Sequence, residues 1–480
     1  MDGTRTHPAA DTASNRLQVT AAYGLMLVTT AGAFLLIRGY GETLIAPPPD
    51  TPPHAGRPAE GSDALLHVLL ALAAVVATGQ VLAKLFVYLG QPPVIGEVVA
   101  GIVLGPSLLG RVAPPVSAYL LPESVAPYLG ILAQLSVVLY MFLVGLELNP
   151  ALLRGRVHAT VAIAHASMLA PFLLGAALAL GLYPRLSSND VPFTSFALFL
   201  GVALSVTAFP VLARILTDRR MHRTRLGVVA LACAATGDVT AWCLLAFVAG
   251  VAQARVGGAL VVGLLTLAYA AFMVLVVRPV ATRFVGRLDE ARLTRGAVAV
   301  VFVALLLSAL ATELIGVHAI FGAFLLGAVV PHDSAVARAF THKLEDLVTV
   351  LLLPAFFAIT GMRAQVGLVS GVGPWLMCGL IILVATVGKF GGTLISARLT
   401  GLGWRESAAL GALMNTRGLM ELIVLNVGLD LGVISPVLFA MMVLMALATT
   451  MATTPLLLVL TPKAPSEAAG DRQGCPATGP

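Results

Sequence analysis

The chain has 480 residues and a formal net charge of +6, and it is 58% hydrophobic and only 11% charged, with a mean hydropathy of +0.95. A soluble domain carries about a quarter charged residues, so this composition excludes a soluble globular protein. The four cysteines form no CxxC pair, which argues against a redox or metal site.

The first 64 residues are predicted to precede the main membrane region. Residues 21–37 form an apolar run that is short for a span, and the segment 47–58 (PPPDTPPHAGRP) is too rich in proline for a helix. A signal segment is the alternative for the apolar run, but no small-residue cleavage site stands out. For residues 1–64 we therefore expect a tail, an extra retained N-terminal helix and a Pro-rich loop.

From residue 65 onward the chain is a succession of continuous apolar runs. Because continuous rather than alternating runs indicate membrane helices, the predicted fold class is an all-α polytopic membrane protein. Residues 65–461 are expected to form one transmembrane domain of about thirteen helices, each of roughly 20 residues. The expected spans are 65–89, 92–110, 125–148, 156–182, 191–217, 224–251, 257–284, 296–316, 317–331, 346–364, 372–398, 404–429 and 435–461.

The positions of Lys and Arg orient these spans. When the C-terminus is placed in the cytoplasm and the sides alternate backwards, most of the 29 Lys and Arg residues fall in cytoplasmic segments, as the positive-inside rule requires. The net charge is then explained by helix anchoring and does not indicate nucleic-acid binding. We expect a multi-pass protein of the plasma membrane, with residues 462–480 as a short, disordered cytoplasmic tail that carries no nucleotide-binding domain.

The order of the spans contains a symmetry. Setting the seventh span aside as a linker leaves two equal sets, and the fifth span of the first set contains Pro210. The fifth span of the second set contains a polar run from Asn415 to Gly418. Interrupted helices at matching positions of two halves are a sequence sign of a transporter binding site. The alternative is that these residues only kink ordinary membrane helices.

One carboxylate stands out among the charges inside spans, which are costly and are candidates for function by default. Asp238 lies in the middle of the sixth span, in ACAATGDVTAWCLLAF, with no cation near it in the chain. Burial disfavours the charged form of a carboxylic acid, so such a group exchanges a proton for a metal ion near neutral pH. We expect Asp238 to bind the transported ion; the alternative is a structural pair with Lys389.

Four further charges lie within spans and are associated with transport in this interpretation. Lys389 either neutralises an acidic partner or titrates itself, and the sequence leaves both roles open. Arg417 stays charged and requires a carboxylate partner. Glu421, four residues later on the same helix face, is one candidate partner and Glu97 is another. We expect Arg417, Glu421 and Glu97 to form a structural network rather than to bind the ion directly.

Two hydroxyl groups precede Pro210 in the fifth span. Ser205 and Thr207, with the carbonyls that Pro210 frees, offer hard oxygen ligands that suit Na⁺ or K⁺. Alternatively, each hydroxyl bonds back to a carbonyl of its own helix. Both residues are therefore kept as ion-binding candidates, with both interpretations open.

Motifs along the membrane region resemble those of the monovalent cation:proton antiporter-2 family, which includes Kef-type bacterial exchangers and plant cation/H⁺ exchangers. They are GQPPVIGEVVAGIVLGPSLLG at 90–110, LYMFLVGLEL at 139–148, LSVTAFPVLARIL at 204–216, TGDVTAWCLLA at 236–246, LPAFFAITGM at 353–362 and MNTRGLMELIVLNVG at 414–428. The resemblance implies an inverted-repeat, broken-helix antiporter fold, a homodimer, and a core domain that alternates like an elevator. It also implies that Asp238 binds the ion beside helix breaks near Thr207 and Asn415.

A departure from the family bears on stoichiometry. Electrogenic relatives have two adjacent aspartates where this chain has Gly237 and Asp238, and Kef-type relatives have Gln-Asp. One carboxylate binds one proton or one cation, so we expect electroneutral exchange of Na⁺ or K⁺ for H⁺. Gly237 is also counted as a helix-break position, together with Pro210, Asn415 and Gly418.

Two rival functions differ in cargo or chemistry. Proton-driven efflux of a small metabolite or ionophore would use the same scaffold and is the main alternative. An enzyme is not expected, because the GxGD motif of intramembrane aspartyl proteases fails at Ala235 and no Tyr-Asp pair occurs. The expected partners are H⁺, the transported cation, the lipid bilayer and a second copy of the chain, without a cofactor, a resident metal or nucleic acid.

Overall fold

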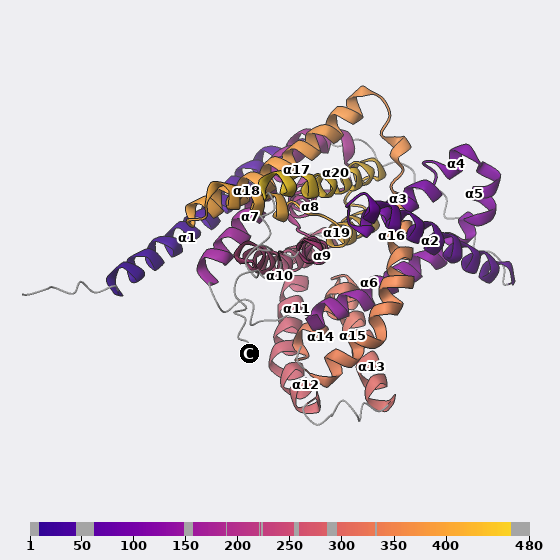
Figure 1. Cartoon of the computed structure of the whole chain (residues 1–480), viewed down its shortest axis with the longest axis horizontal. Helices are drawn as coiled ribbons and strands as arrows, with labels where there is room; N and C mark the ends of the chain where they lie inside the picture. The colour runs from indigo at the N-terminus through magenta and orange to yellow at the C-terminus, as the bar shows by residue number, and fades with distance from the viewer. Residues whose placement is uncertain are drawn as a thin grey trace, which may run out of the picture.

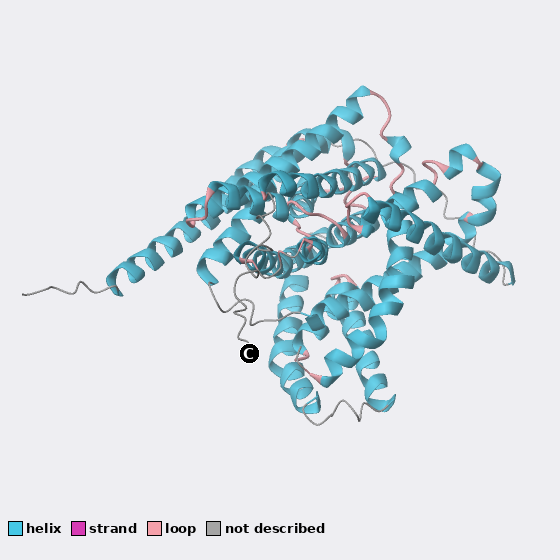
Figure 2. Ribbon diagram, in the orientation of Figure 1, coloured by secondary structure: helices cyan, strands magenta, loops and turns pink. Residues whose placement is uncertain are grey.

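The computed structural model describes residues 9–44, 62–147, 157–188, 190–219, 221, 224–253, 259–285, 295–331 and 334–461, and within them every regular element is a helix (Figure 2). Twelve helical stretches of these residues are long and apolar enough to cross a membrane, and α18 with α19, bent by 44° at a break, adds a thirteenth. The twelve include the N-terminal helix, and a shorter apolar helix, α14, occupies the ninth predicted span. The all-α polytopic prediction is confirmed.

The helices form two bodies (Figure 1). The first is here called the core body, and its most extensive helix contact joins α7 to α17. An N-terminal helix, α1 (Ala9–Gly41), lies against it. The core body consists of α7 (Val157–Leu186), α8 (Phe193–Ser205), α9 (Phe209–Asp218), α10 (Arg225–Gln253), α17 (Val372–Leu399), α18 (Trp404–Met414), α19 (Leu419–Asp430) and α20 (Pro436–Leu460).

The second body, here called the scaffold body, is built on the pairs α2–α3, α3–α16, α6–α14 and α13–α14. It consists of α2 (Ser62–Tyr88), α3 (Pro93–Leu104), α6 (Ala126–Glu147), α11 (Ala259–Phe272), α13 (Arg295–Ile315), α14 (Ala319–Val329) and α16 (Leu353–Arg363). Shorter helices connect these elements: α4 (Leu109–Val112), α5 (Pro114–Leu120), α12 (Arg278–Val285), α15 (Ala335–Asp346), 3₁₀ turns at Glu123–Val125 and Val366–Leu368, and π segments at Met273–Val277 and Leu347–Leu352.

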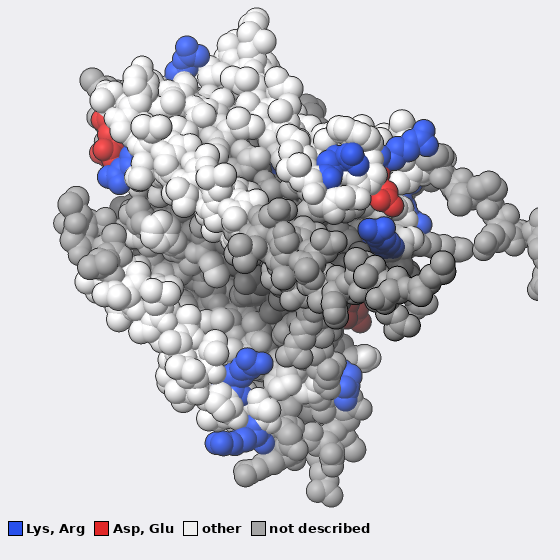
Figure 3. All heavy atoms as spheres, turned by 90° about the vertical axis from the view of Figure 1, so that its left-hand side faces the viewer, with Lys and Arg blue, Asp and Glu red and all other residues white. Residues whose placement is uncertain are grey.

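The surface of the described chain is that of a membrane protein. In Figure 3 most of the visible described surface is uncharged, with isolated Lys, Arg, Asp and Glu side chains. On α13, large apolar side chains such as Leu307, Leu310 and Leu314 are more than half exposed. Lipid covers such apolar side chains without a free-energy cost, whereas their exposure to water would be unfavourable.

Small residues set the spacing of the scaffold helices. At the α6–α14 crossing, a Cβ on Gly145 would lie 2.3 Å from the Phe324 carbonyl oxygen, and a Cβ on Gly327 would lie 2.3 Å from the Phe142 carbonyl oxygen. Membrane helices gain little from the hydrophobic effect and depend on close packing through such positions. The glycines therefore allow the backbones of α6 and α14 to touch.

The N-terminal apolar run is a helix that packs on the core body. The ring of Tyr23 meets His165 of α7 edge-on at a centroid distance of 5.5 Å, and Phe34 packs against Phe172 at 5.7 Å. Just beyond α1, Glu42 accepts a hydrogen bond from the Thr194 hydroxyl at 3.0 Å. The Pro-rich stretch that follows lies outside the described residues.

Two sequence-based expectations differ from the structure. The tenth span is longer than 346–364 and extends from Val336 to Leu368, because α15 and a π segment continue into α16. The predicted helix break at Gly237 is wrong, since α10 runs through it without interruption. A helix tolerates an isolated glycine at a modest cost. A Cβ on Gly237 would meet the Met168 sulfur at 3.7 Å, an ordinary van der Waals contact, so the surroundings do not require a glycine here.

The contact between α6 and α14 yields a prediction about stability. The Gly145→Ala variant should lose about 1–3 kcal/mol, since the added methyl group forces two backbones apart. Gly130→Ala on the same helix is the matched control, because nothing lies within 4 Å of its Cβ position and alanine favours a helix. Thermal unfolding in detergent compares the two. Equal midpoints would contradict the proposed close packing.

Candidate functional site

Two broken spans meet in the interior of the core body. Figure 2 shows the loops between α8 and α9 and between α18 and α19 close together among the helices. The backbone N–H of Ala208 donates to the Thr416 carbonyl at 3.0 Å, and the Thr207 hydroxyl donates to the Met414 carbonyl at 3.1 Å. The two interruptions are therefore held against each other, and we call this place the crossover.

Three of the expected break positions flank the interruptions. Pro210 lies in the first turn of α9, where its fixed φ fits and its missing N–H costs no helical bond. Asn415 caps the end of α18, and Gly418, with an extended φ of 167°, precedes α19. Proline thus starts a half-helix here and does not kink a continuous one.

Asp238 lies on α10, which packs against α8, α18 and α19. Its side chain is 6% exposed, and its Oδ1 atom has no hydrogen-bond partner among the described residues. Two neutral oxygens of the crossover, Asn415 Oδ1 and Thr416 Oγ1, are likewise buried and without a partner there. Buried polar atoms are normally hydrogen-bonded, so these three unpartnered acceptors are candidates for binding a proton or a cation.

Lys389 is fully buried on α17. Its ammonium donates to the carbonyl oxygen of Ser205, the last residue of α8. It attracts the Asp238 carboxylate electrostatically, but the described chain contains no hydrogen bond or ion pair between them. The expected alternative, a structural Asp238–Lys389 pair, is therefore not formed in this conformation.

Arg417 and Glu421 form an ion pair of 3.0 Å in which both side chains are fully buried. The same guanidinium donates to the carbonyls of Ala203 at 3.1 Å and Leu204 at 2.7 Å. With Lys389, two cations thus bond the last three carbonyls of α8, where the helix dipole is negative. Glu421 lies in the first turn of α19, at a positive helix end. The two positive side chains therefore lie at a negative helix end, and the negative Glu421 lies at a positive one.

The hydroxyl groups of the fifth span both donate to carbonyls. Ser205 Oγ lies 2.7 Å from the Gly201 carbonyl and 2.8 Å from the Met168 carbonyl, which is the back-bonded arrangement. Thr207 bonds across the crossover, as described above. A hydroxyl that donates its hydrogen keeps lone pairs, so neither arrangement prevents these oxygens from facing an ion.

Glu97 lies apart from the network. It is half-buried on α3, and its side chain lies beside Gly79 of α2. Ile95 and Val98 of α3 line a small pocket together with Arg417, and Glu97 does not line it. No hydrogen bond or ion pair of Glu97 occurs in the described chain, so it is not the partner of Arg417 here.

One residue that sequence reasoning missed holds the second break in place. The Thr450 hydroxyl of α20 accepts from the Arg417 backbone N–H at 2.9 Å and donates to the Arg417 carbonyl at 2.8 Å. It therefore satisfies two backbone groups that the interrupted helix leaves without intrahelical partners. The signal in the sequence is the run TTMATT within an apolar span.

The described residues contain no group of three or more His, Cys, Asp or Glu side chains placed to hold a resident metal ion. The unpartnered acceptors are instead an Asp238 oxygen on α10 and the amide and hydroxyl oxygens of Asn415 and Thr416 at the crossover. Hard oxygen donors of this kind suit alkali cations better than transition metals.

Comparison with known proteins places the chain in a family. Residues 70–459 match the family described as sodium/hydrogen exchanger, transmembrane. The chain belongs to this exchanger family. Among its relatives is the Na⁺/H⁺ antiporter NhaS4 of Synechocystis sp., which is 41% identical over 404 residues, 84% of this chain and 98% of the relative.

Other exchangers are similar over part of their length. Cation/H⁺ antiporter 20 of Arabidopsis thaliana is 39% identical over 82% of this chain, and K⁺/H⁺ antiporter 1 of Saccharomyces cerevisiae is 35% identical over 77%. The chain spans only 48% and 44% of these two relatives, about half of each. The solved sodium proton antiporter MjNhaP1 of Methanocaldococcus jannaschii superposes with a TM-score of 0.61 over 82% of this exchanger and 96% of that chain, at 14% identity. This likeness supports the antiporter fold.

The buried ion pair yields a prediction about folding. The Glu421→Gln variant leaves Arg417 charged in a fully buried site, and losing one partner of such a pair costs about 3–5 kcal/mol. A lower unfolding midpoint in detergent is expected. Glu345→Gln, which removes an exposed carboxylate from α15, is the control and should leave the midpoint unchanged. Equal midpoints for the two variants would contradict the structural role of Glu421.

Proposed function

We propose that this exchanger is a secondary antiporter that exchanges Na⁺ or K⁺ for H⁺, with Asp238 binding the cation and the proton in turn. The observation that carries the proposal is the unpartnered, buried Asp238 oxygen on the helix that packs against both broken spans. A carboxylate in such surroundings binds one positive species at a time. We propose Asn415 and Thr416 as additional oxygen ligands, beside Ser205 and Thr207.

The proposed exchange is electroneutral. Arg417 and Glu421 neutralise each other, which leaves Asp238 and Lys389 as the charges that matter for transport. Lys389 is bonded to the negative end of α8, where a positive charge is stabilised, so we infer that it keeps its proton through the cycle. The site then carries the same net charge with H⁺ bound as with Na⁺ or K⁺ bound, so the two opposite movements cancel and a complete cycle transfers no net charge.

Cation exchange is favoured over efflux of a metabolite or ionophore. The similar proteins bear the names of Na⁺/H⁺, K⁺/H⁺ and cation/H⁺ antiporters. The oxygens at the crossover also fit a bare alkali ion, which needs no hydrophobic pocket. We propose a transporter that catalyses no chemical reaction.

The proposed setting is a homodimer in the plasma membrane with a cytoplasmic C-terminus. The exposed apolar faces of the scaffold body offer a surface for a second copy. Arg219, Arg225, Arg283 and Arg295 lie at helix ends that share a side with the end of α20 when the spans alternate, which fits the positive-inside rule. Residues 1–64 and 462–480 are proposed to flank one transmembrane domain at 65–461.

Removing the Asp238 charge tests the function. In proteoliposomes with a preset pH gradient, addition of Na⁺ or K⁺ should dissipate the gradient for the natural protein. The Asp238→Asn variant should show less than about a hundredth of that rate, because an amide binds neither H⁺ nor a cation in exchange. Glu345→Gln is the control and should retain full exchange. Dissipation by neither cation, or full exchange by Asp238→Asn, would sink the proposal.

Voltage tests the stoichiometry. An imposed membrane potential, with no gradient of pH or of the transported cation, should drive no net exchange, because one charge moves in each direction. Flux of H⁺ is followed with a dye inside the vesicles, and the same vesicles with a pH gradient serve as the positive control. A flux of H⁺ driven by voltage alone would refute electroneutral exchange. It would imply that Lys389 also releases its proton during the cycle.

A further inference from the structure

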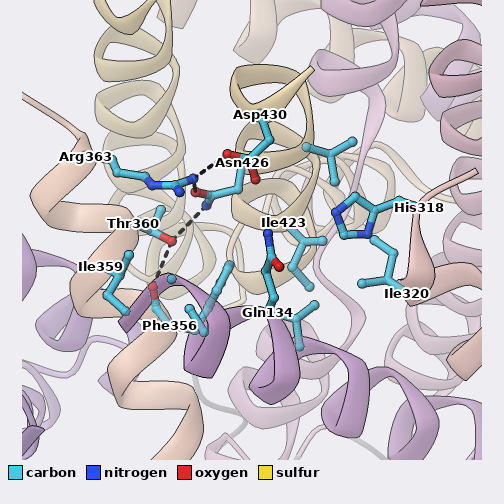
Figure 4. Close-up of a pocket in the computed structure, with 14 residues that line it drawn as sticks. Gln134, His318, Ile320, Phe356, Ile359, Thr360, Arg363, Ile423, Asn426 and Asp430 are labelled. Carbon is cyan, nitrogen blue, oxygen red and sulfur yellow. Dashed lines mark hydrogen bonds and ion pairs between the residues drawn. The ribbon is translucent and has the colours of Figure 1, made fainter. Parts of the chain in front are cut away.

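A pocket opens between the two bodies, at the helix ends that lie opposite to the end of α20 (Figure 4). Gln134 and His318 line it from the scaffold body, on α6 and at the start of α14, and Asn426 and Asp430 line it from α19 of the core body. Ile423 and Phe356 make up part of its apolar wall. The cavity therefore lies where a core that moves relative to the scaffold would change its contacts.

Polar bonds cross this boundary. Arg363, at the end of α16, donates from its guanidinium to Asp430 Oδ1 at 2.8 Å and to Asn426 Oδ1 at 3.1 Å. The amide nitrogen of Asn426 donates to the Thr360 hydroxyl at 2.8 Å. Figure 4 shows the side chains reaching toward one another across the gap between α16 and α19. We call Arg363, Thr360, Asn426 and Asp430 the polar clamp.

The clamp differs from two other ion pairs in the described chain. Arg38–Glu42 and Arg417–Glu421 each join residues four positions apart on one stretch of chain, so they stabilise a local segment. Arg363 and Asp430 belong to different bodies and are 67 residues apart. Their bond exists only while the scaffold and the core keep the relative position that the structure shows.

We propose that the polar clamp is a latch that stabilises this conformation and opens in each transport cycle. The proposal rests on the proposed antiport function and on the alternation of the core body that the family resemblance implies. The side chains of Arg363 and Asp430 are 36% and 33% exposed, so solvent weakens their attraction. Partly exposed pairs shift an equilibrium by roughly two- to five-fold, which is enough to bias a conformation and weak enough to be broken in every turnover.

The test measures the distance between the two bodies directly. Spin labels attached through Leu314→Cys on α13 and Val372→Cys on α17 use side chains that are 78% and 77% exposed. The natural Cys233, Cys243, Cys378 and Cys475 are replaced by Ala in the full chain. Double electron–electron resonance in lipid nanodiscs then reports how often each distance between core and scaffold occurs.

Breaking the latch should depopulate the conformation in which the clamp is closed. Arg363→Ala and Asp430→Ala should each lower the population ratio of the closed-clamp conformation to the alternative conformation by about two- to five-fold. The exchanged pair, Arg363→Asp with Asp430→Arg, should restore most of that ratio. Arg185→Ala, which removes an exposed arginine from the end of α7, is the matched control and should leave the distances unchanged.

Three outcomes would overturn the latch: an unchanged distance distribution in both single variants, an equal shift in Arg185→Ala, or no recovery in the exchanged pair. Asn426→Ala provides a second variant should a charge substitution fail to fold, and it should shift the ratio in the same direction. Because the distances are measured without transport, the result is separable from the proposed function. Unchanged distances with intact exchange would reject the latch alone, whereas exchange by Asp238→Asn would reject the proposed ion site alone.

Discussion

The structure depends on a helix that ends inside the membrane. At the end of α8 the carbonyls of Ala203, Leu204 and Ser205 point into the protein interior, where no bulk water satisfies them. Arg417 and Lys389, both from the second half of the chain, donate to these three groups. An unsatisfied carbonyl at this depth costs several kcal/mol, so the two halves are tied together by the need to cap one half-helix.

The capping of α8 explains the state of Asp238. Glu421 neutralises Arg417 directly, and the Lys389 ammonium is bonded to a carbonyl. The remaining carboxylate therefore keeps an oxygen without a partner, although a cation lies near enough to attract it. In a low-dielectric interior an unpaired carboxylate is costly, and it gains most from a species that brings a positive charge. The capping of one helix thus leaves an unpartnered carboxylate oxygen on another.

The two bodies are held internally by a different kind of contact from the one that joins them at the polar clamp. Inside the scaffold, glycines such as Gly145 and Gly327 bring backbones into contact, and such close packing has few alternative arrangements. At the clamp, partly exposed polar side chains bridge α16 and α19 beside a cavity. Close packing keeps each body rigid, and solvent-weakened polar bonds permit their relative position to change.

The sequence by itself determined the membrane class, the number and order of the spans and the position of both helix breaks, and it singled out Asp238 as a candidate. These properties are local, because hydropathy, proline and an isolated charge act at their own place in the chain. The tertiary structure decided which side chains bond to one another. Gly237 lies within the uninterrupted α10, Glu97 makes no ion pair with Arg417 in the described chain, and Lys389 bonds a carbonyl rather than Asp238. The clamp joins residues far apart in sequence. Such pairings depend on how helices rotate and pack against one another, and no local pattern encodes that rotation.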